Sequence, residues 1–522
     1  MRKIFFALTL IILTLAACKK TEELSGPDRL FRPVLKEALA SDGNWIAVSW
    51  EPIKDAASYT IQLSKDSFRT IISSATVDTT YHLFENLKWE QLYQVQVKAN
   101  AKDSSKNSKF SDLGSIKTPK FPTILNTPSI SDVTDNAVKV SWTTSGAAVT
   151  SIKILKTSDS SVIKQVDLTA TDVTNQYKIV SGLTGSTGYT IFLYSGTSVR
   201  GWADFTTKAP YAGTVIDLRG ITGRPSVLAD TLPLIPSGST VLLDRSQTYN
   251  ISSAVNLSKS VIITSGADLT ASTQAAIYFT SNFNFNAGAV IDSIEFNDVY
   301  MKSDNYGSRY IFNTTNSATV GKMKFMNSKM EIFRGIVRLQ SGTATVNNFI
   351  VNNCIIDSIS GYGIITVDNT TVKADNISIT NSTIYKAEKV ISSTKQTAGS
   401  TSVLVSNCTF NETITGTNTY IDYGGTNVTN GITVSSCIFG VGKSGSTTIR
   451  DIKTGSSTTV NASNNYRTSD YVSAGAANDL PNIQIYPKPS TQLWQDPING
   501  NFKIIDNSFA GRANSGDPRW RQ

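Results

Sequence analysis

Residues 28–118 alternate apolar and polar side chains over short runs, and clusters of polar turn residues separate these runs. The clearest runs are residues 45–50, 59–63 and 93–97. A period of two is typical of a β-strand that buries one face and exposes the other. The pattern therefore predicts an antiparallel β-sandwich, a fold that takes about 100 residues.

The same pattern returns over residues 120–208, where the run 138–142 matches the run 47–50 of the first module. Each module also has a leucine six residues before a tyrosine. The two pairs are Leu87 with Tyr93 and Leu183 with Tyr189. These features resemble the fibronectin type III pattern, which implies that each tyrosine hydroxyl bonds back to nearby backbone.

Proline-containing segments at residues 117–122 and 207–210 separate the two modules from each other and from the rest of the chain. An alternative interpretation is that the Trp and Tyr residues of the modules are stacking platforms for sugar rings. A sandwich core, however, needs aromatic residues at these positions. We therefore expect both modules to act as spacers.

The pattern changes at about residue 211, and no proline occurs between Pro236 and Pro481. Proline cannot donate a hydrogen bond to a sheet, so its absence fits strands that are paired on both sides. Within this region one position recurs at spacings of 29, 26, 28, 26, 29 and 28 residues. The recurring residues are Asp298, Asn327, Asn353, Asn381, Asn407, Ser436 and Asn464. A period of this length with only short β runs is typical of a solenoid.

Residues near the recurring position fall into columns of similar chemistry. Four residues before it stand Ile294, Met323, Phe349, Ile377, Val403, Ile432 and Val460. Directly after it stand Val299, Ser328, Cys354, Ser382, Cys408, Cys437 and Asn465. Equivalent residues of neighbouring coils would lie about 4.8 Å apart. The apolar column would then be buried, and the asparagines would form a ladder of side-chain amides that closes a tight turn.

This register resembles the coils of the right-handed parallel β-helix of pectate-lyase-like proteins, which use such asparagine ladders. The resemblance covers residues 211–522, and the segment 496–520 is similar to the closing segment of such domains in Bacteroidota surface lipoproteins. The predicted fold class is all-β, with two fibronectin type III-like sandwiches followed by a right-handed parallel β-helix. The alternative for the C-terminal region is a β-sandwich of similar strand content, which does not demand so regular a register.

The N-terminus has the layout of a secretory signal. Arg2 and Lys3 precede an apolar run over residues 4–15, and small residues stand before Cys18. The run is shorter than the about 20 apolar residues that a membrane-spanning helix needs. Small residues followed by cysteine resemble the lipobox of bacterial lipoproteins, which implies removal of residues 1–17 and lipidation of Cys18. The alternative is a simple cleaved signal with an incidental cysteine.

Residues 18–27 would then form a tether to the outer membrane. The lysines and acidic residues at positions 19–23 resemble the surface-export tags of Bacteroidota lipoproteins. The expected location is therefore the outer membrane, with a lipid anchor and exposure at the cell surface.

Composition and charge narrow the possible functions. The 522 residues are 40% hydrophobic and 17% charged, which excludes a coiled coil and a highly charged disordered chain. The net charge of +8 falls to +6 when Arg2 and Lys3 are removed with the signal. No dense cluster of basic residues of the kind that nucleic-acid-binding proteins use is present. The single histidine, His82, and the lack of a CxxC spacing argue against a metal site and a Ser-His-Asp triad.

Three cysteines besides Cys18 fall in one column of the repeat, namely Cys354, Cys408 and Cys437. Cys408 and Cys437 stand on neighbouring coils and would approach disulfide distance, which an exported setting permits. Stacked side chains on neighbouring coils point in the same direction, however, whereas a disulfide needs two side chains that point toward each other. The sequence therefore favours small buried thiols over a disulfide.

Two columns of polar residues are candidates for a catalytic site. The first contains Lys302, Glu331, Asp357, Tyr385 and Asn411. The second contains Arg338, Thr366, Ser392 and Asp422. Stacked Glu331 and Asp357 would raise one carboxyl pKa or share a cation such as Ca²⁺. Together with Arg338 as the base, Glu331 and Asp357 are the residue types that a lyase of this fold uses. The alternative is that all three are solvated or locally paired surface groups.

Four tyrosines of the same region are candidates for stacking on sugar rings. They are Tyr362, Tyr385, Tyr420 and Tyr423. The alternative for each is ordinary packing at an edge of the fold.

We expect a cell-surface lipoprotein whose β-helix binds or captures polysaccharide. A first alternative is a polysaccharide lyase that cleaves uronic-acid-containing glycan by β-elimination, with Ca²⁺ as its cofactor; no cofactor is predicted otherwise. A second alternative is a structural or adhesive surface protein. The expected partners are the membrane through the lipid anchor, polysaccharide and other outer-membrane glycan-uptake proteins, but not nucleic acid.

Overall fold

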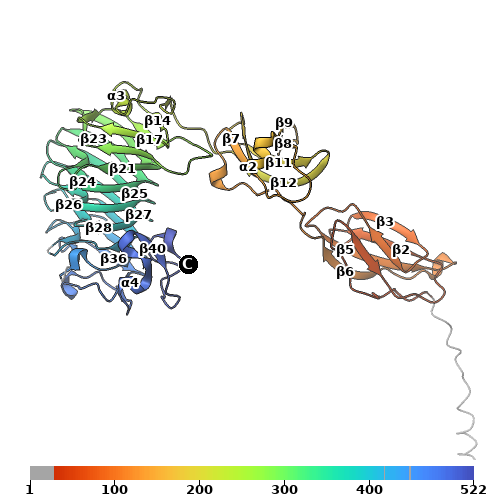
Figure 1. The fold of residues 1–522 in the computed structure, drawn as a ribbon. Coiled ribbons are helices and arrows are strands. Elements are labelled where there is room, and N and C mark those ends of the chain that lie inside the picture. The colour runs from red at the N-terminus through yellow and green to blue at the C-terminus, as the bar shows by residue number, and fades with distance from the viewer. Residues whose placement is uncertain (1–28, 417, 446–447) are drawn as a thin grey trace, which may run out of the picture.

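The computed structural model describes residues 29–416, 418–445 and 448–522. The predicted signal peptide, Cys18 and the tether lie outside these residues. Figure 1 shows two small β domains followed by a long stack of parallel coils. No helix within the described ranges is long and apolar enough to cross a bilayer.

Within the described residues the helices are short. They are α2 (Ala170–Asn175), α3 (Val227–Thr231), α4 (Ser490–Leu493) and the 3₁₀ turns η1 (Ser104–Lys106), η2 (Ile130–Asp132), η3 (Lys443–Gly445), η4 (Ala476–Asn478), η5 (Pro497–Asn499) and η6 (Pro518–Trp520).

The first domain packs a four-stranded antiparallel sheet, in the order β3-β2-β5-β6, against the pair β1-β4. Its strands are β1 (Ile46–Ser49), β2 (Ser58–Ser64), β3 (Ile71–Val77), β4 (Tyr81–Phe84), β5 (Leu92–Asn100) and β6 (Ser111–Lys117). Trp50 is fully buried between the sheets and packs edge-on against Tyr59, with ring centroids 5.4 Å apart. The Tyr93 hydroxyl accepts the backbone N–H of Lys88 at 3.1 Å, as the sequence predicts.

The second domain repeats this arrangement, with the order β12-β11-β8-β9 in one sheet and β10-β7 in the other. Its strands are β7 (Ala137–Ser141), β8 (Ser151–Lys156), β9 (Val162–Asp167), β10 (Tyr177–Ser181), β11 (Gly188–Ser195) and β12 (Ser198–Thr206). The Tyr189 hydroxyl accepts the Thr184 N–H at 2.9 Å, and Trp142 is buried in the core. Both domains are therefore fibronectin type III-like sandwiches, and their buried tryptophans serve the cores rather than sugar rings.

From β13 to β38 the strands pair in parallel and form a solenoid of about nine turns over residues 215–467. One ten-stranded sheet contains β13 (Val215–Asp217), β14 (Ser239–Leu243), β17 (Val261–Ser265), β20 (Ala289–Asn297), β23 (Ala318–Met326), β25 (Thr345–Asn352), β27 (Lys373–Thr380), β30 (Ser402–Ser406), β33 (Ile432–Ser435) and β36 (Val460–Ser463). The parallel pairing confirms the predicted β-helix and excludes a further sandwich.

A second set of strands, sixteen in number, winds around the other side of the coils. It contains β15 (Thr248–Ile251), β16 (Val255–Leu257), β18 (Ala275–Phe279), β19 (Phe283–Phe285), β21 (Val299–Ser303), β22 (Tyr310–Thr314), β24 (Lys329–Leu339), β26 (Ile355–Val367), β28 (Thr383–Ala387), β29 (Ile391–Ser392), β31 (Thr409–Asn411), β32 (Thr419–Asp422), β34 (Ile438–Phe439), β35 (Arg450–Lys453), β37 (Tyr466–Arg467) and β38 (Gln484–Ile485).

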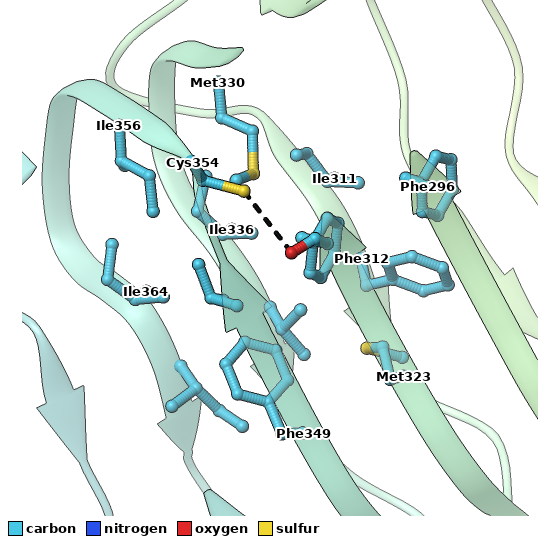
Figure 2. Close-up of a cluster of buried hydrophobic side chains, with 14 of the residues drawn as sticks. Phe296, Ile311, Phe312, Met323, Met330, Ile336, Phe349, Cys354, Ile356 and Ile364 are labelled. Carbon is cyan, nitrogen blue, oxygen red and sulfur yellow. Dashed lines mark hydrogen bonds between the residues drawn. The ribbon is translucent and has the colours of Figure 1, made fainter. Parts of the chain in front are cut away.

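The core of the solenoid consists of the predicted apolar columns. Met323 pairs with Ile294 of the preceding coil and with Phe349 of the next, and all three side chains are fully buried. Figure 2 shows Cys354 among these core residues, where its thiol donates to the carbonyl oxygen of Phe325 at 3.3 Å. Each coil thus buries its apolar residues against their equivalents on both neighbours.

The three cysteines of the solenoid are free thiols that are fully buried. Burial raises the pKa of Cys354 to about 12. Each thiol donates to backbone carbonyls, and Ser382 occupies the same column between Cys354 and Cys408. The column therefore holds small buried donors, as the sequence favours.

The recurring polar position forms a tight left-handed turn on seven successive coils. All seven of its residues have φ between +51° and +55°. Asparagine and aspartate tolerate this conformation better than other residues that carry a Cβ. The Asn353 amide donates to the Asn327 side chain at 2.8 Å, as the predicted ladder requires. The Asn381 amide instead reaches Asn352, one residue before the recurring position, at 2.8 Å.

A second column of left-handed residues bends the coils five residues later. It contains Ile332, Ser358, Lys386 and Glu412, with φ of +64°, +54°, +54° and +45°. This bend divides β24 and β26 into a first arm and a second arm, and the strand register shifts between Phe333 and Gly335. The sequence analysis did not predict this bend, because its residues are of no common type.

Both ends of the solenoid are covered by other parts of the chain. At the first coils, α3 contributes Val227 and Leu228 to the main core. At the last coils, the segment after residue 486 folds back over the turns through α4, β39 (Trp494–Asp496) and β40 (Asn501–Ile504). Arg519 donates to the Asn353 side chain at 2.6 Å. This C-terminal segment, which contains residues 496–520, shields the polar turns of several coils.

Replacing Asn381 by alanine should lower the free energy of unfolding by about 2 kcal/mol. Alanine costs about 1–2 kcal/mol in the left-handed conformation, which asparagine adopts more readily, and the hydrogen bond to Asn352 is lost. Asn381→Gly keeps the backbone freedom and should cost less than half as much. Urea unfolding followed by circular dichroism measures both losses, and equal losses would contradict the role assigned to the turn.

The buried carboxyl of Asp451 should make stability depend on pH. Asp451 is 1% exposed, it accepts the Tyr471 hydroxyl and the Leu480 N–H, and burial raises its pKa to about 6. The unfolded chain loses this proton near pH 3.9. The free energy of unfolding should therefore fall as the pH rises from about 4 to about 6.

The test compares melting temperatures of the native protein and the Asp451→Asn variant across that pH range. The native protein should lose stability relative to the variant as the pH rises, because only the native protein must ionise a buried group. A constant difference between the two curves would contradict the prediction.

Candidate functional site

A cleft of about 450 Å³ opens on the second arms of the middle coils. Its lining consists of Arg334, Ser360, Gly361, Tyr362, Thr366, Val367, Asp368, Lys389, Ser392, Thr394 and Lys395. These residues come from β24, β26, β29 and the connections on either side of β29 and after β26. The cleft therefore crosses three consecutive coils along the axis of the solenoid.

The base of the cleft is a column of side chains in strand register. Arg338 pairs with Thr366 of the next coil, and Thr366 pairs with Ser392 of the coil after that. The Thr366 hydroxyl donates to the Tyr362 carbonyl at 2.6 Å. Asp422 follows Ser392 in the same register, as the sequence predicts, and is half-buried beyond the cleft. The column thus presents hydroxyl groups in the middle of the cleft.

Tyr362 forms the aromatic wall of the cleft and is half-buried. The guanidinium carbons of Arg334 and Arg338 lie 4.8 Å and 4.3 Å from its ring centroid, within the range of cation–π attraction. The tyrosine approaches the preceding coil closely only because Gly335 stands there. A Cβ on Gly335 would lie 2.6 Å from the Cβ of Tyr362.

Arg338 is held by its neighbours. Its Nε donates to Asp368 at 2.8 Å, its second terminal nitrogen also pairs with Asp368, and Gln340 accepts a further bond at 3.2 Å. Its side chain is 17% exposed. An arginine that is ion-paired and stacked on Tyr362 orients the wall of the cleft. It does not have the free lone pair that a general base needs.

Three other cations line the cleft without a carboxylate partner. Within the part of the chain that the structure describes, no ion pair forms at Arg334, Lys389 or Lys395. Glu388 lies next to the cleft, but it accepts the Tyr306 hydroxyl at 2.7 Å. The cleft therefore carries a surplus of positive charge.

Glu331 and Asp357 lie on the first arms, and neither lines the cleft. They are neighbours in strand register, as predicted, but Glu331 is ion-paired with Lys329 at 2.7 Å and Lys302 at 3.1 Å. Burial raises the pKa of Glu331, but two lysines and the Tyr300 hydroxyl outweigh it and hold that pKa below its usual value.

The pair was predicted to raise one carboxyl pKa, and Glu331 does not carry that raised pKa. Two lysine ammonium groups already occupy the carboxylate that a shared Ca²⁺ would need. Among the residues with described positions, no group of three or more His, Cys, Asp or Glu side chains is arranged to hold a metal ion. The predicted trio of Arg338, Glu331 and Asp357 is not brought together, because the second bend turns the two arms apart.

Three of the four candidate sugar-stacking tyrosines are buried. Tyr385, Tyr420 and Tyr423 are 7%, 3% and 0% exposed. Tyr385 packs against Phe502 of the C-terminal segment, with ring centroids 5.4 Å apart. Their selection as an exposed binding face is therefore wrong, and only Tyr362 presents its ring at a cleft.

A larger hollow of about 1090 Å³ lies between the second sandwich and the first coils. Its lining includes Tyr211 from the connection between the two domains and the ion pair of Arg245 with Asp298. This hollow is formed by the junction of two domains, whereas the cleft at Tyr362 is built within the coils themselves.

The sequence analysis missed Arg334, Lys389 and Lys395. The residues of the second arms do not keep a constant distance from the recurring asparagine position, because connections of different length precede them. One sequence feature could have located these residues. Gly335 and Gly363 pair in register, so the residues just before them, Arg334 and Tyr362, lie at equivalent positions on consecutive coils. The column of Arg338, Thr366 and Ser392, in contrast, was predicted correctly.

Two family models match parts of the region that forms the solenoid. Residues 247–387 match a family model described as a domain of unknown function (DUF4957), and residues 403–520 match another, DUF5123. No curated protein matches the chain.

Among solved structures, the chain is similar to a two fibronectin type III domain segment from chicken tenascin, at 18% identity and a TM-score of 0.17. That match covers 34% of this chain and 99% of the tenascin segment. The chain is also similar to chicken CNTN1 FN1-FN3 domains, at 15% identity and a TM-score of 0.15. This second match covers 35% of this chain and 69% of the CNTN1 chain.

The pairing of Arg338 with Asp368 should be visible in a double-mutant cycle. We expect Arg338→Gln and Asp368→Asn each to destabilise the protein and the double variant to lose less than the sum, with a coupling of about 1–2 kcal/mol. The same cycle at the exposed pair Arg224 and Asp230 is the control and should give a coupling below about 1 kcal/mol. Additive losses at Arg338 and Asp368 would contradict the pairing.

Proposed function

We propose that the protein captures polysaccharide at the cleft beside Tyr362. The observation that supports this function best is the combination of a half-buried tyrosine ring with hydroxyl and cationic side chains in one open cleft. Sugar rings stack on aromatic faces, and their hydroxyl groups need hydrogen-bonding partners. Successive coils repeat at about 4.8 Å, so the cleft offers contacts in steps along an extended chain.

The remainder of the chain suits a receptor held away from a membrane. We propose that it is a surface lipoprotein of the Bacteroidota type, anchored to the outer membrane through lipid on Cys18. The two sandwiches would act as spacers between the anchor and a pectate-lyase-like β-helix. Other outer-membrane glycan-uptake proteins would be its partners, since captured glycan must be passed on.

The chemistry of the solenoid favours binding over β-elimination. A lyase of the predicted kind needs a free base near a neutralised uronate carboxylate. Arg338 is engaged by Asp368 and Tyr362, and Glu331 is engaged by two lysines on the other arm. These contacts support a binding protein in which the polar groups position a ligand.

The test uses the chain without residues 1–17 and with Cys18→Ser, in affinity gels that contain acidic or neutral polysaccharides. We expect retardation in at least one gel and no rise in ultraviolet absorbance from unsaturated products. Tyr362→Ala should weaken binding about tenfold, or about 1.4 kcal/mol, because the aromatic wall of the cleft is lost.

Tyr81→Ala is the matched control, because Tyr81 is 51% exposed in the first sandwich, far along the chain from the cleft. It should bind like the parent protein. Retardation that survives Tyr362→Ala would place the binding surface elsewhere. Accumulation of unsaturated product would replace the binding function with the lyase function.

A further inference from the structure

We infer that the cleft beside Tyr362 binds an anionic group of the glycan, a uronate carboxylate or a sulfate ester. This inference rests on the proposed function and specifies its ligand class. Arg334, Lys389 and Lys395 bring three positive charges to a cleft of about 450 Å³. Charge-assisted hydrogen bonds from such groups are the usual means of holding carboxylate and sulfate oxygens.

The carboxylates near the cleft do not neutralise these cations. Asp368, the carboxylate in the lining, is bound by Arg338 through two nitrogens. Glu388 accepts the Tyr306 hydroxyl and lies 3.7 Å from the ammonium group of Lys443. Each carboxylate thus has a cation of its own, and the charge of the three remaining cations is available to a ligand.

The position of Arg334 distinguishes it from an ordinary surface arginine. Its backbone N–H donates to the Arg309 carbonyl of the preceding coil at 2.7 Å, and its guanidinium lies on the Tyr362 ring. Stacking limits the freedom of the side chain before a ligand arrives, so that less conformational entropy is lost on binding. Arg309, the equivalent on the preceding coil, is already paired with Asp304 at 2.6 Å.

The arrangement of the cations follows the axis of the solenoid. Arg334 and Tyr362 stand on consecutive coils, and the backbone of Lys389 lies next to Gly363 on the coil after them. A Cβ on Gly363 would lie 2.8 Å from the Lys389 carbonyl oxygen. A linear polymer with a charged group on successive sugars would meet these cations in turn, with the tyrosine ring between them.

Hydroxyl groups complete the cleft. Ser360, Ser392 and Thr394 line it beside the cations. They accept and donate hydrogen bonds, which suits the neutral hydroxyl groups of a sugar that also bears one anionic group. The cations would therefore select acidic over neutral glycans, and the tyrosine and hydroxyl groups would hold the ring.

The experiment measures binding of the chain from residue 18, with Cys18→Ser, to four polymers by isothermal titration calorimetry. Polygalacturonate and its methyl ester form one pair, and dextran sulfate and dextran form the other. We expect binding to at least one acidic polymer and at least tenfold weaker binding to its neutral counterpart. The acidic member that binds distinguishes carboxylate from sulfate recognition.

The variant Lys389→Gln with Lys395→Gln should weaken binding of that acidic polymer about tenfold, which is about 1.4 kcal/mol. Binding should also weaken when the salt concentration rises from about 50 mM to about 300 mM, since salt screens exposed charges. The control variant is Lys322→Gln with Lys324→Gln on β23, which removes the same charge from another sheet. It should stay within twofold, and melting temperatures verify that both variants are folded.

The outcomes separate the inference from the proposed function. Equal binding of an acidic polymer and its neutral partner, unaffected by the lysine variant, would overturn the anionic ligand and leave polysaccharide capture standing. Equal losses in the two double-lysine variants would mean general charge attraction and would also overturn it. Failure to bind any of the four polymers, together with no retardation in the affinity gels, would overturn both.

Discussion

The parallel hydrogen bonds between equivalent strands of neighbouring coils are the constraint on which the rest of the solenoid depends. A shift of one residue would move every apolar column to the outer face. The left-handed turn at the recurring asparagine prevents this shift, because each coil must turn at the same point. Asn353 and Asn381 tie that turn to the preceding coil through their amides. The fixed register then allows a site to be assembled from separate coils.

The second bend gives the two arms of each coil different surroundings. At Ile332 a β-branched residue adopts φ of +64°, a conformation that only strong constraints from neighbouring structure maintain. The strands on both sides of it are paired with adjacent coils, which supplies those constraints. The first arm turns Glu331 toward two lysines, and the second arm turns Arg338 toward Asp368. One strand thus contributes charged groups to two separate sets of contacts.

Most charges on these arms are used within the fold, and this makes the exceptions informative. The carboxylates of Glu331 and Asp368 each form ion pairs that are partly shielded from solvent. Along the cleft the pairing is incomplete, because among the described residues Arg334, Lys389 and Lys395 form no ion pair. Repulsion between unpaired cations adds nothing to the stability of the fold, and the proposed anionic ligand would supply the missing negative charge.

The two sandwiches, the solenoid, its apolar columns and its asparagine turns are all predictable from the amino-acid sequence. Each of them follows from a periodic pattern of residue types that the backbone geometry requires, as the hydrogen bonds of Tyr93 and Asn353 illustrate. Which polar residues are accessible depends instead on how the coils and the C-terminal segment pack together. The C-terminal segment buries Tyr385, and the second bend separates Glu331 from Arg338. Burial and bending depend on contacts between residues far apart in the chain, and no local pattern encodes those contacts.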